Sequence, residues 1–280
     1  MTQLQTFRQA EPVIAAASPR RRVHGKGILP PAVLFAGILV VWEAISASLS
    51  PGRKYLLPSP QSVLMHGLLA HDAYSQILPS FLRTALLSLG GFLVAIVFGM
   101  LLAALMYRFR WFERAAFPYL VALQAVPVLA IAPLMAVVFG YSYTAKGLIV
   151  ILIAFFPIPA NFLLGLRSVD AGLVDLFRLH RSSWWTRFFK LALPNAVPQL
   201  LTGFRISAGL AVIGAIVGEE FFQAGVPGLG MRLLQYLDQV EYNRLYGALI
   251  LSSLLGIGFY SFFTWLSRRL LQSWHESAAG

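Results

Sequence analysis

The sequence predicts an all-α fold: a polytopic membrane bundle of about six transmembrane helices, with a helical hairpin between the fourth and the fifth. Composition carries the first part of this prediction. Hydrophobic residues make up 58% of the 280 positions, charged residues only 12%, and the mean hydropathy is +0.71. Ordinary soluble domains are less apolar and about 25% charged. Six stretches are also apolar over the roughly 20 residues that a helix needs to cross a bilayer.

The six predicted spans follow one another with short, more polar connections. They lie near residues 30–49, 80–106, 115–139, 147–166, 198–222 and 246–266. Lys and Arg concentrate in alternate connections, with dense runs at 20–26, 108–114 and 178–190. Because positive residues stay on the cytoplasmic side, this alternation places the N-terminus, the hairpin and the C-terminus in the cytoplasm. The same rule accounts for the net charge of +11 without nucleic acid.

Two tails flank the membrane domain, which the pattern places at residues 29–270. Residues 1–28 are polar, show no sustained periodicity, and are predicted to form a disordered cytoplasmic tail. Residues 271–280 are expected to form a second cytoplasmic tail. The Arg-rich stretch before the first span could be part of a twin-arginine secretion signal. The apolar run that follows reaches full spanning length, which favours a retained helix.

Several classes of chemistry are excluded by what the chain lacks. It contains no Cys, so it forms neither disulfides nor thiolate metal sites, and its five His residues show no metal-ligand spacing. It has neither a Walker A loop nor a Gly-x-Ser-x-Gly elbow; the nearest phosphate-loop candidate, residues 140–147, lacks the Ser or Thr after Lys146. We therefore expect no catalytic residue, no metal site and no cofactor in this chain, and no enzymatic activity of its own.

Small and helix-breaking residues recur inside the predicted spans. Pro127 and Pro133 fall in the third span, Pro157 and Pro159 in the fourth, and the fifth carries Gly residues at close intervals. Such residues permit close helix approach and bends. A static bundle also uses them, but they are typical of transporters, whose helices rock around a translocation path.

The connection between the fourth and fifth spans is too polar to span and too apolar to be a free linker. Asp170 is a suitable N-cap for a first short helix, and Ser182 or Ser183 can open a second. Pro194 is expected to end this second helix before the next span begins. Apolar side chains recur along the connection at helical spacing, which predicts one apolar face: Val169, Leu173, Leu176, Phe177, His180, Trp184 and Phe188.

The residues alone leave two interpretations of this hairpin open. It is either an amphipathic loop whose Trp and Arg side chains lie among lipid headgroups, or an exposed helix that docks in the groove of a cytoplasmic partner and passes motion to the spans. The charge of the segment does not choose between them.

The spacing of this segment resembles the cytoplasmic Glu-Ala-Ala loop of permease subunits of bacterial ATP-binding-cassette (ABC) importers. In register, residues 175–177 (Asp-Leu-Phe) replace Glu-Ala-Ala, Arg181 replaces the loop's Gly, and Leu191, Leu193 and Pro194 match its end. The Gly of that loop normally permits a left-handed turn, which is costly for Arg. The departure at Arg181 implies either a reshaped turn or a different mode of docking.

Other segments resemble the branch of this family that handles nitrate, sulfonates, taurine and related solutes. They run in the family's order: LLPSPQSVL (56–64), QAVPVLAIAPL (124–134), VFGYS (138–142), AFFPI (154–158), GLRSVD (165–170), LPNAVPQLLTGFR (193–205) and GLAVIGAIVGEEF (209–221). The resemblance covers most of the membrane domain. It implies a bacterial inner-membrane protein with both termini cytoplasmic, which pairs with a second permease copy, two ABC ATPase subunits that hold ATP and Mg, and an extracytoplasmic solute-binding protein.

The resemblance also implies two groups of functional residues. The contact with the ATPase is expected at Asp175, Leu176, Phe177, Arg178, Arg181, Ser182 and Ser183. The translocation path is expected near Gln124, Asn161 and Glu219, where packing hydrogen bonds between helices are the alternative role.

Several functions remain to be separated. The solute is a nitrate-, sulfonate- or taurine-like molecule, or alternatively a pyrimidine vitamin precursor or a flavin. A secondary transporter that works without an ATPase is a further alternative, as is an integral-membrane enzyme. The hairpin and the lack of a coupling-ion cluster argue against the secondary transporter.

Overall fold

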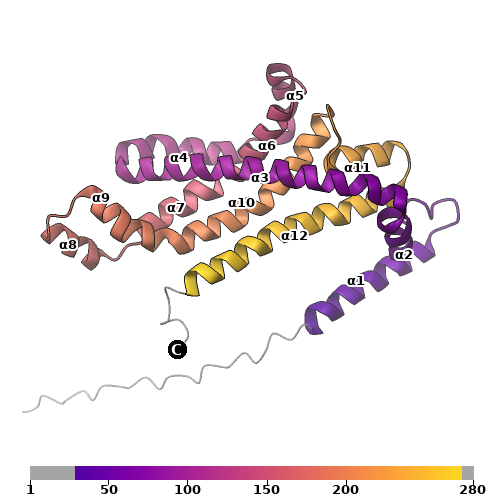
Figure 1. Cartoon of the computed structure of the whole chain (residues 1–280), viewed down its shortest axis with the longest axis horizontal. Coiled ribbons are helices and arrows are strands. Elements are labelled where there is room, and N and C mark those ends of the chain that lie inside the picture. The colour runs from indigo at the N-terminus through magenta and orange to yellow at the C-terminus, as the bar shows by residue number, and fades with distance from the viewer. Residues whose placement is uncertain (1–28, 273–280) are drawn as a thin grey trace, which may run out of the picture.

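The computed structural model describes residues 29–272. The predicted tail at 1–28 lies outside them, and so does the tail predicted at 271–280 except for residues 271 and 272, which belong to the last helix. The described residues form helices joined by turns and contain no strand. In order these are α1 (Leu29–Ser48), α2 (Pro60–Ser62), η1 (Val63–Leu69), α3 (His71–Arg108), α4 (Arg110–Ala125), α5 (Val128–Phe139), α6 (Tyr143–Phe155), α7 (Pro157–Arg167), α8 (Ala171–Leu179), α9 (Trp184–Arg187), η2 (Phe188–Ala192), α10 (Leu193–Phe221), α11 (Leu229–Asp238) and α12 (Tyr242–Gln272). The expected all-α bundle is confirmed (Figure 1).

Within residues 29–272, five helical segments are long and apolar enough to cross a membrane: 29–48, 71–108, 143–167, 184–221 and 242–271. The third span expected at 115–139 is divided between two helices, α4 and α5, which meet at an angle of 98°. Val126 and Pro127 are extended at this break, with ψ of 125° and 99°. Proline disfavours helical geometry in the residue before it and cannot donate a backbone hydrogen bond. The two helices together count as a sixth span only if the bent pair crosses the bilayer as one.

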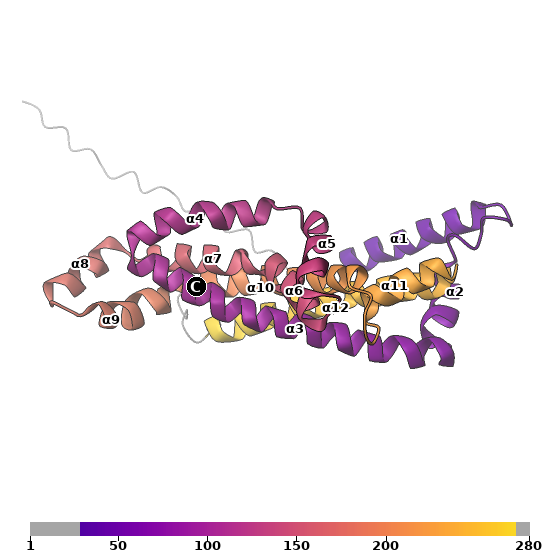
Figure 2. The same cartoon turned by 90° about the horizontal axis from the view of Figure 1, so that it is seen from above.

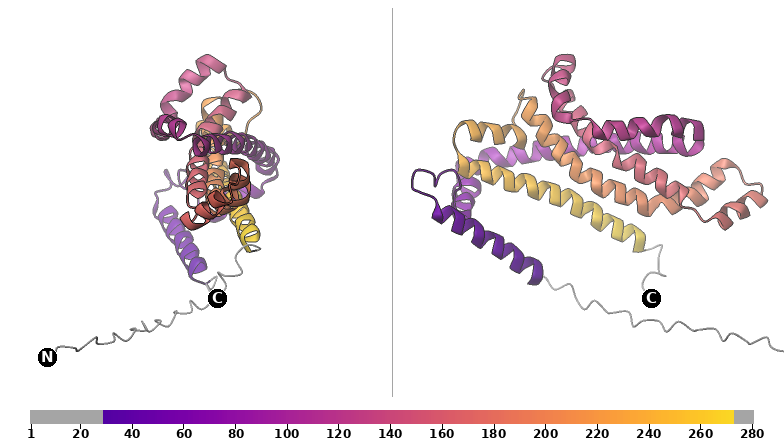
Figure 3. Two further views of the ribbon diagram at one scale, coloured as in Figure 1. Left: turned by 90° about the vertical axis from the view of Figure 1, so that its left-hand side faces the viewer. Right: turned by 180° about the vertical axis from the view of Figure 1, so that it is seen from behind.

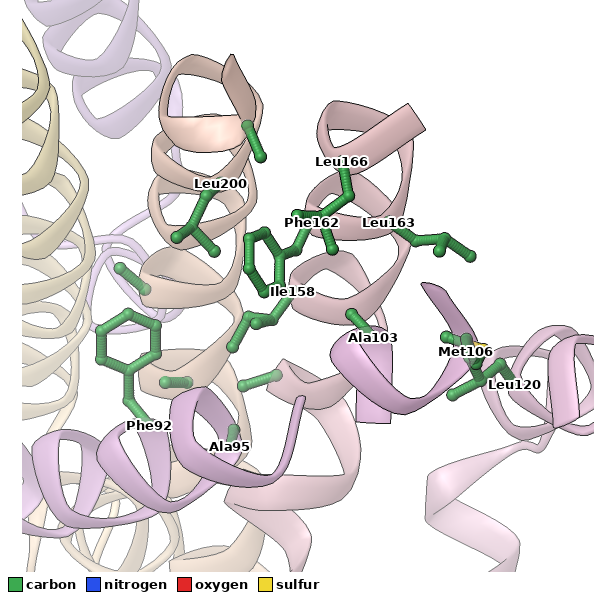
Figure 4. Close-up of a cluster of buried hydrophobic side chains, with 14 of the residues drawn as sticks. Phe92, Ala95, Ala103, Met106, Leu120, Ile158, Phe162, Leu163, Leu166 and Leu200 are labelled. Atoms are coloured by element: carbon green, nitrogen blue, oxygen red, sulfur yellow. The ribbon is translucent and has the colours of Figure 1, made fainter. Parts of the chain in front are cut away.

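The core forms where α10 packs between α3, α6, α7 and α12. Figure 4 shows side chains of α3, α7 and α10 meeting there, with Phe92, Ile158 and Phe162 fully buried. Glycine permits close approach of these helices: a Cβ on Gly214 of α10 would lie 2.8 Å from the Cα of Val150 in α6. Tight contact through small residues is the usual way for membrane helices to associate.

The second helix of the hairpin runs into the fifth span without a break, so the expected stop at Pro194 is wrong. Leu193 is helical, with φ −62° and ψ −49°, and its N–H donates to the Phe188 carbonyl five residues earlier. A π-helical turn, η2, therefore precedes the proline. Such a wider turn gives the proline ring room against the preceding turn of the helix. Residues 184–221 consequently form one continuous helical rod.

The first span lies beside the bundle rather than within it (Figures 1 and 3). Its contacts gather at its C-terminal end, where Trp42 Nε1 donates to the Pro58 carbonyl at 3.0 Å and Ser46 Oγ donates to the Leu57 carbonyl at 2.8 Å. The Trp42 ring also packs on Tyr246 of α12, with centroids 5.7 Å apart. The rest of α1 exposes apolar side chains, as expected for a helix surrounded by lipid.

Candidate functional site

The hairpin α8–α9 projects from one end of the bundle (Figure 2), beyond the ends of α3 and α7. The first helix begins where predicted, since the Asp170 carboxylate accepts hydrogen bonds from the backbone N–H groups of Gly172 and Leu173 at 2.8 and 3.3 Å. A carboxylate at this position satisfies free N–H groups of the first turn and complements the helix dipole. The sequence thus fixes the start of the hairpin through a single side chain.

The turn between the two short helices keeps the left-handed geometry that the family's glycine supplies. Arg181 has a φ of +47°. Its N–H donates to the Arg178 carbonyl at 2.9 Å, and the Ser182 N–H donates to the Phe177 carbonyl at 3.1 Å. These two bonds define a Schellman motif with Arg181 at the left-handed position. Of the two alternatives raised by the sequence, the turn is therefore not reshaped, and Arg181 adopts the conformation at a steric cost.

The second helix is fixed to the bundle by aromatic packing. Ser183 caps it by accepting a hydrogen bond from the Thr186 N–H at 3.1 Å. Trp184 stacks on Phe188 with centroids 5.1 Å apart and planes 15° from parallel, and Phe188 reaches Tyr107 of α3 at 6.0 Å. Phe188 is only 8% exposed. The base of the hairpin is thus part of the main hydrophobic core.

Hydrogen bonds that sequence reasoning missed also anchor the first helix of the hairpin. Asn195 Nδ2, at the start of α10, donates to the Gly165 carbonyl at 3.1 Å and to Ser168 Oγ at 2.9 Å. Arg167, the last residue of α7, forms an ion pair with Glu113 of α4. Asn195 directly follows Pro194 in segment 193–205, which resembles the family. That position was the one indication in the sequence that Asn195 has a structural role. These contacts fix the segment between α7 and α8.

The outward face of α8 is apolar and uncovered. Leu173 and Leu176 are about half exposed, and Leu179 is 81% exposed. Asp175 and Arg178 form an exposed ion pair at 3.3 Å on the same helix, which contributes little stability by itself. The predicted contact residues therefore divide. Asp175 and Leu176 are exposed and free to meet a partner, and Arg178 lines a cavity at the root of the hairpin. Ser182 instead holds the turn, because its Oγ donates to the Phe177 carbonyl at 2.6 Å.

The three residues expected along the translocation path are not brought together. Gln124 is exposed on α4, just before the bend. Asn161 on α7 bonds the Pro157 carbonyl of its own helix at 2.8 Å and lies beside Gly203 of α10. Glu219 lies further along α10 from Gly203 by about 24 Å at the rise of a helix. Their role in the path stays a prediction.

Glu219 instead occupies a buried junction at the end of the bundle opposite the hairpin. It is 3% exposed, and its carboxylate accepts hydrogen bonds from the Thr84 hydroxyl at 2.8 Å and from the Gly230 N–H at 2.9 Å. The Thr84 hydroxyl oxygen also accepts a bond from the Leu229 N–H at 2.8 Å. The carboxylate thereby joins α10 and α3 to the first turn of α11. A charge so placed needs these partners, because an unpaired one is costly away from water.

The left-handed turn makes a stability prediction. Replacing Arg181 with Gly (Arg181→Gly) removes a steric cost of about 1 kcal/mol, so the thermal unfolding midpoint of the purified full-length chain should rise by about 2–4 °C. The matched control is Arg178→Gly, three residues earlier in regular helix, which should lower the midpoint by a similar amount. A decrease of equal size in both variants would show that position 181 has no left-handed turn.

Comparison with known proteins agrees with this architecture. The family model "Binding-protein-dependent transport system inner membrane component" matches residues 95–272. The formylaminopyrimidine transport permease protein ThiX of Halalkalibacterium halodurans is 38% identical to this chain, over 82% of it and 89% of the relative. The putative aliphatic sulfonates transport permease protein SsuC of Bacillus subtilis is 31% identical, over 94% of this chain and 92% of the relative.

A solved structure shares the fold. The inward-facing MetNI methionine ABC transporter aligns with a TM-score of 0.58 at 16% identity, over 73% of this chain and 98% of the other. At 16% identity the match shows only that the two proteins share an arrangement of helices. The family match, however, extends from the middle of α3 to the end of α12 and includes the hairpin. The chain therefore belongs to the family of inner-membrane components of binding-protein-dependent transport systems, the permease subunits of ABC importers.

Proposed function

We propose that this chain is the permease half of an ATP-driven importer, in which α8 receives the motion of a cytoplasmic ATPase subunit and passes it to the bundle. One observation supports this most directly: α8 presents an uncovered apolar face on a helix that is fixed at both ends. Leu176 and Leu179 lie on this face, with the Asp175–Arg178 pair beside them. An amphipathic helix of this kind suits a groove on a partner protein.

The interfacial-loop interpretation is less well supported by the contacts. A loop that only rests among lipid headgroups needs no defined tertiary packing, whereas this hairpin has a cap at Asp170, a second cap at Ser183 and an aromatic base at Phe188. Rigid attachment is what transmission of force requires. The same proposal includes a second permease copy, two ATPase subunits that carry ATP and Mg, and an extracytoplasmic solute-binding protein.

Docking through α8 can be tested by charge insertion. The double variant Leu176→Asp/Leu179→Asp should lower copurification of the co-expressed ATPase subunit by about tenfold or more, because it places carboxylates in an apolar contact. The matched control is Leu237→Asp on α11 at the other end of the bundle, since Leu237 is 47% exposed and Leu176 is 48% exposed. Unchanged copurification in the double variant would contradict the docking role.

The same preparation tests the assembly. Native mass spectrometry of the complex should give two copies of this chain with two ATPase subunits. Solute uptake by vesicles that contain this chain alone would instead support the secondary transporter.

The proposed orientation places the hairpin in the cytoplasm and the loop before α11 outside. The chain has no Cys, so single cysteines can be introduced at Arg181 and Val226, both of which are exposed. An impermeant maleimide should label Val226→Cys in intact spheroplasts and should label Arg181→Cys only after permeabilisation. Labelling of both from the same side would rule out this topology.

The solute is proposed to be a small polar organic molecule, with a formylaminopyrimidine as the first candidate and an alkanesulfonate as the second. The relative named for formylaminopyrimidine transport is 38% identical and the relative named for sulfonates is 31% identical. Because the binding protein delivers the solute, calorimetric titration of the cognate binding protein with formylaminopyrimidine, taurine, nitrate and riboflavin decides among them. Tight binding of the sulfonate and none of the pyrimidine would reverse the order.

A further inference from the structure

A basic cavity lies at the root of the hairpin, apart from the outward face of α8. Its volume is about 520 Å³, and it is lined by the ends of α3 and α7, the start of α4, and parts of α8, α9 and η2. Five arginines line it, and no acidic residue does within the described part of the chain: Arg108, Arg110, Arg167, Arg178 and Arg187. Their segments are far apart in sequence, so the fold itself brings these charges together.

Only two of the five guanidinium groups have a carboxylate partner. Arg167 pairs with Glu113, and Arg178 pairs with Asp175. Among residues 29–272, Arg108, Arg110 and Arg187 form no ion pair. The Nε of Arg187 is buried and has no hydrogen-bond acceptor within the described residues. The cavity therefore has an excess of positive charge, because three of its five guanidinium groups have no carboxylate partner among the described residues.

Membrane topology explains why arginines are frequent near the ends of the spans. It does not explain why five of them line the same cavity. The positive-inside rule acts on the number of Lys and Arg residues near the ends of spans and not on their mutual placement. Like charges that gather in one cavity repel each other, and an anion between them offsets that repulsion. A cavity lined by five arginines is therefore suited to an anion.

The depth of the cavity indicates which anion this is. Helix α3 ends at Arg108, the helical segment that includes α7 ends at Arg167, and the segment that includes α9 and α10 begins at Trp184. All three segments are long and apolar enough to cross a membrane, so we expect a cavity lined by their ends to lie near the lipid headgroups. Tyr107 and Trp184 also line it, and such aromatic side chains are typical of the membrane interface.

We propose that this cavity binds the phosphate headgroup of an anionic phospholipid of the cytoplasmic leaflet. The planar guanidinium fork matches the geometry of phosphate oxygens, and basic pockets between membrane helices on this side are suited to such headgroups. Arg108 belongs to α3, and its guanidinium lies 5.3 Å from the centre of the Trp184 ring in α9. A headgroup held by Arg108 and Arg187 therefore connects the hairpin to α3. This inference concerns the cavity alone and does not depend on the proposed ATPase contact.

Lipid retention provides the test. The purified full-length chain in detergent is titrated with cardiolipin, with phosphatidylglycerol and with phosphatidylcholine, and bound lipid is counted by native mass spectrometry. Cardiolipin and phosphatidylglycerol should remain bound where phosphatidylcholine does not. The double variant Arg108→Gln/Arg187→Gln should lower the affinity for cardiolipin by about tenfold or more. The matched control, Arg268→Gln/Arg269→Gln, removes two exposed arginines at the end of α12 and should leave the affinity unchanged.

The outcomes separate this proposal from its alternatives. Equal affinity in the cavity variant and the control, or equal retention of phosphatidylcholine, overturns it. Competition by inorganic phosphate as strong as that by cardiolipin makes this a site for a free anion and also overturns it. So does complete displacement of the lipid by the ATPase subunit, because the arginines then serve the partner. If the double variant does not fold, Arg108→Lys keeps the charge without the fork and should lower cardiolipin affinity while phosphatidylcholine retention stays unchanged.

Discussion

The packing of Phe188 beneath Trp184 and against Tyr107 is the contact on which the proposed mechanism depends. A helix that only lay at the membrane surface could not move the bundle, because it would shift without its neighbours. Phe188 is 8% exposed and belongs to the same core as the buried side chains of α3, α7 and α10. The hairpin is consequently an extension of the hydrophobic core. A large loss in stability is expected for a Phe removed from such a site.

Two turns of this structure place unsuitable residues in left-handed geometry, one at each end of the bundle. Arg181 has a φ of +47° after α8, and Val240 has a φ of +62° after α11. At the second turn the Glu241 N–H donates to the Tyr236 carbonyl at 2.9 Å and the Val240 N–H donates to Leu237 at 3.1 Å, which repeats the Schellman pattern. A β-branched residue there is a genuine outlier. Strain of this kind persists only where surrounding packing enforces it, and it concentrates at functional turns.

Much of this architecture is readable from the sequence, and the exceptions have physical causes. Spanning length locates five of the spans, because the bilayer imposes this requirement on local sequence. The cap at Asp170 is equally local. The bend between α4 and α5 is not, since Pro127 permits a kink of any size and tertiary contacts determine its angle. Pro194 led to a wrong prediction because a π-helical turn, η2, precedes it, and no pattern in the local sequence indicates that turn.

The site residues also divide into those that local sequence predicts and those that only tertiary contacts determine. Spacing places Leu173 and Leu176 on one apolar face of α8, because a helix face is a periodic property. No local pattern reveals that Asn195 bonds the Gly165 carbonyl, or that Glu219 bonds Thr84, since each pair joins distant parts of the chain. The convergence of five arginines at one cavity is hidden in sequence for the same reason. A charged residue within an apolar segment of the sequence shows that its burial would be costly and that it needs a partner. It does not show which residue that partner is.

The rod formed by residues 184–221 connects the two ends of the molecule. Its 38 residues extend about 57 Å at the rise of an α-helix, from the aromatic base of the hairpin to the carboxylate of Glu219. That carboxylate bonds Thr84 of α3 and the first turn of α11. A tilt imposed at α9 therefore acts on a hydrogen-bonded junction at the far end, where bonds must either move with the rod or break. The π-helical turn at 188–192 is the one irregular segment along this path, and it lies next to the point where force would enter.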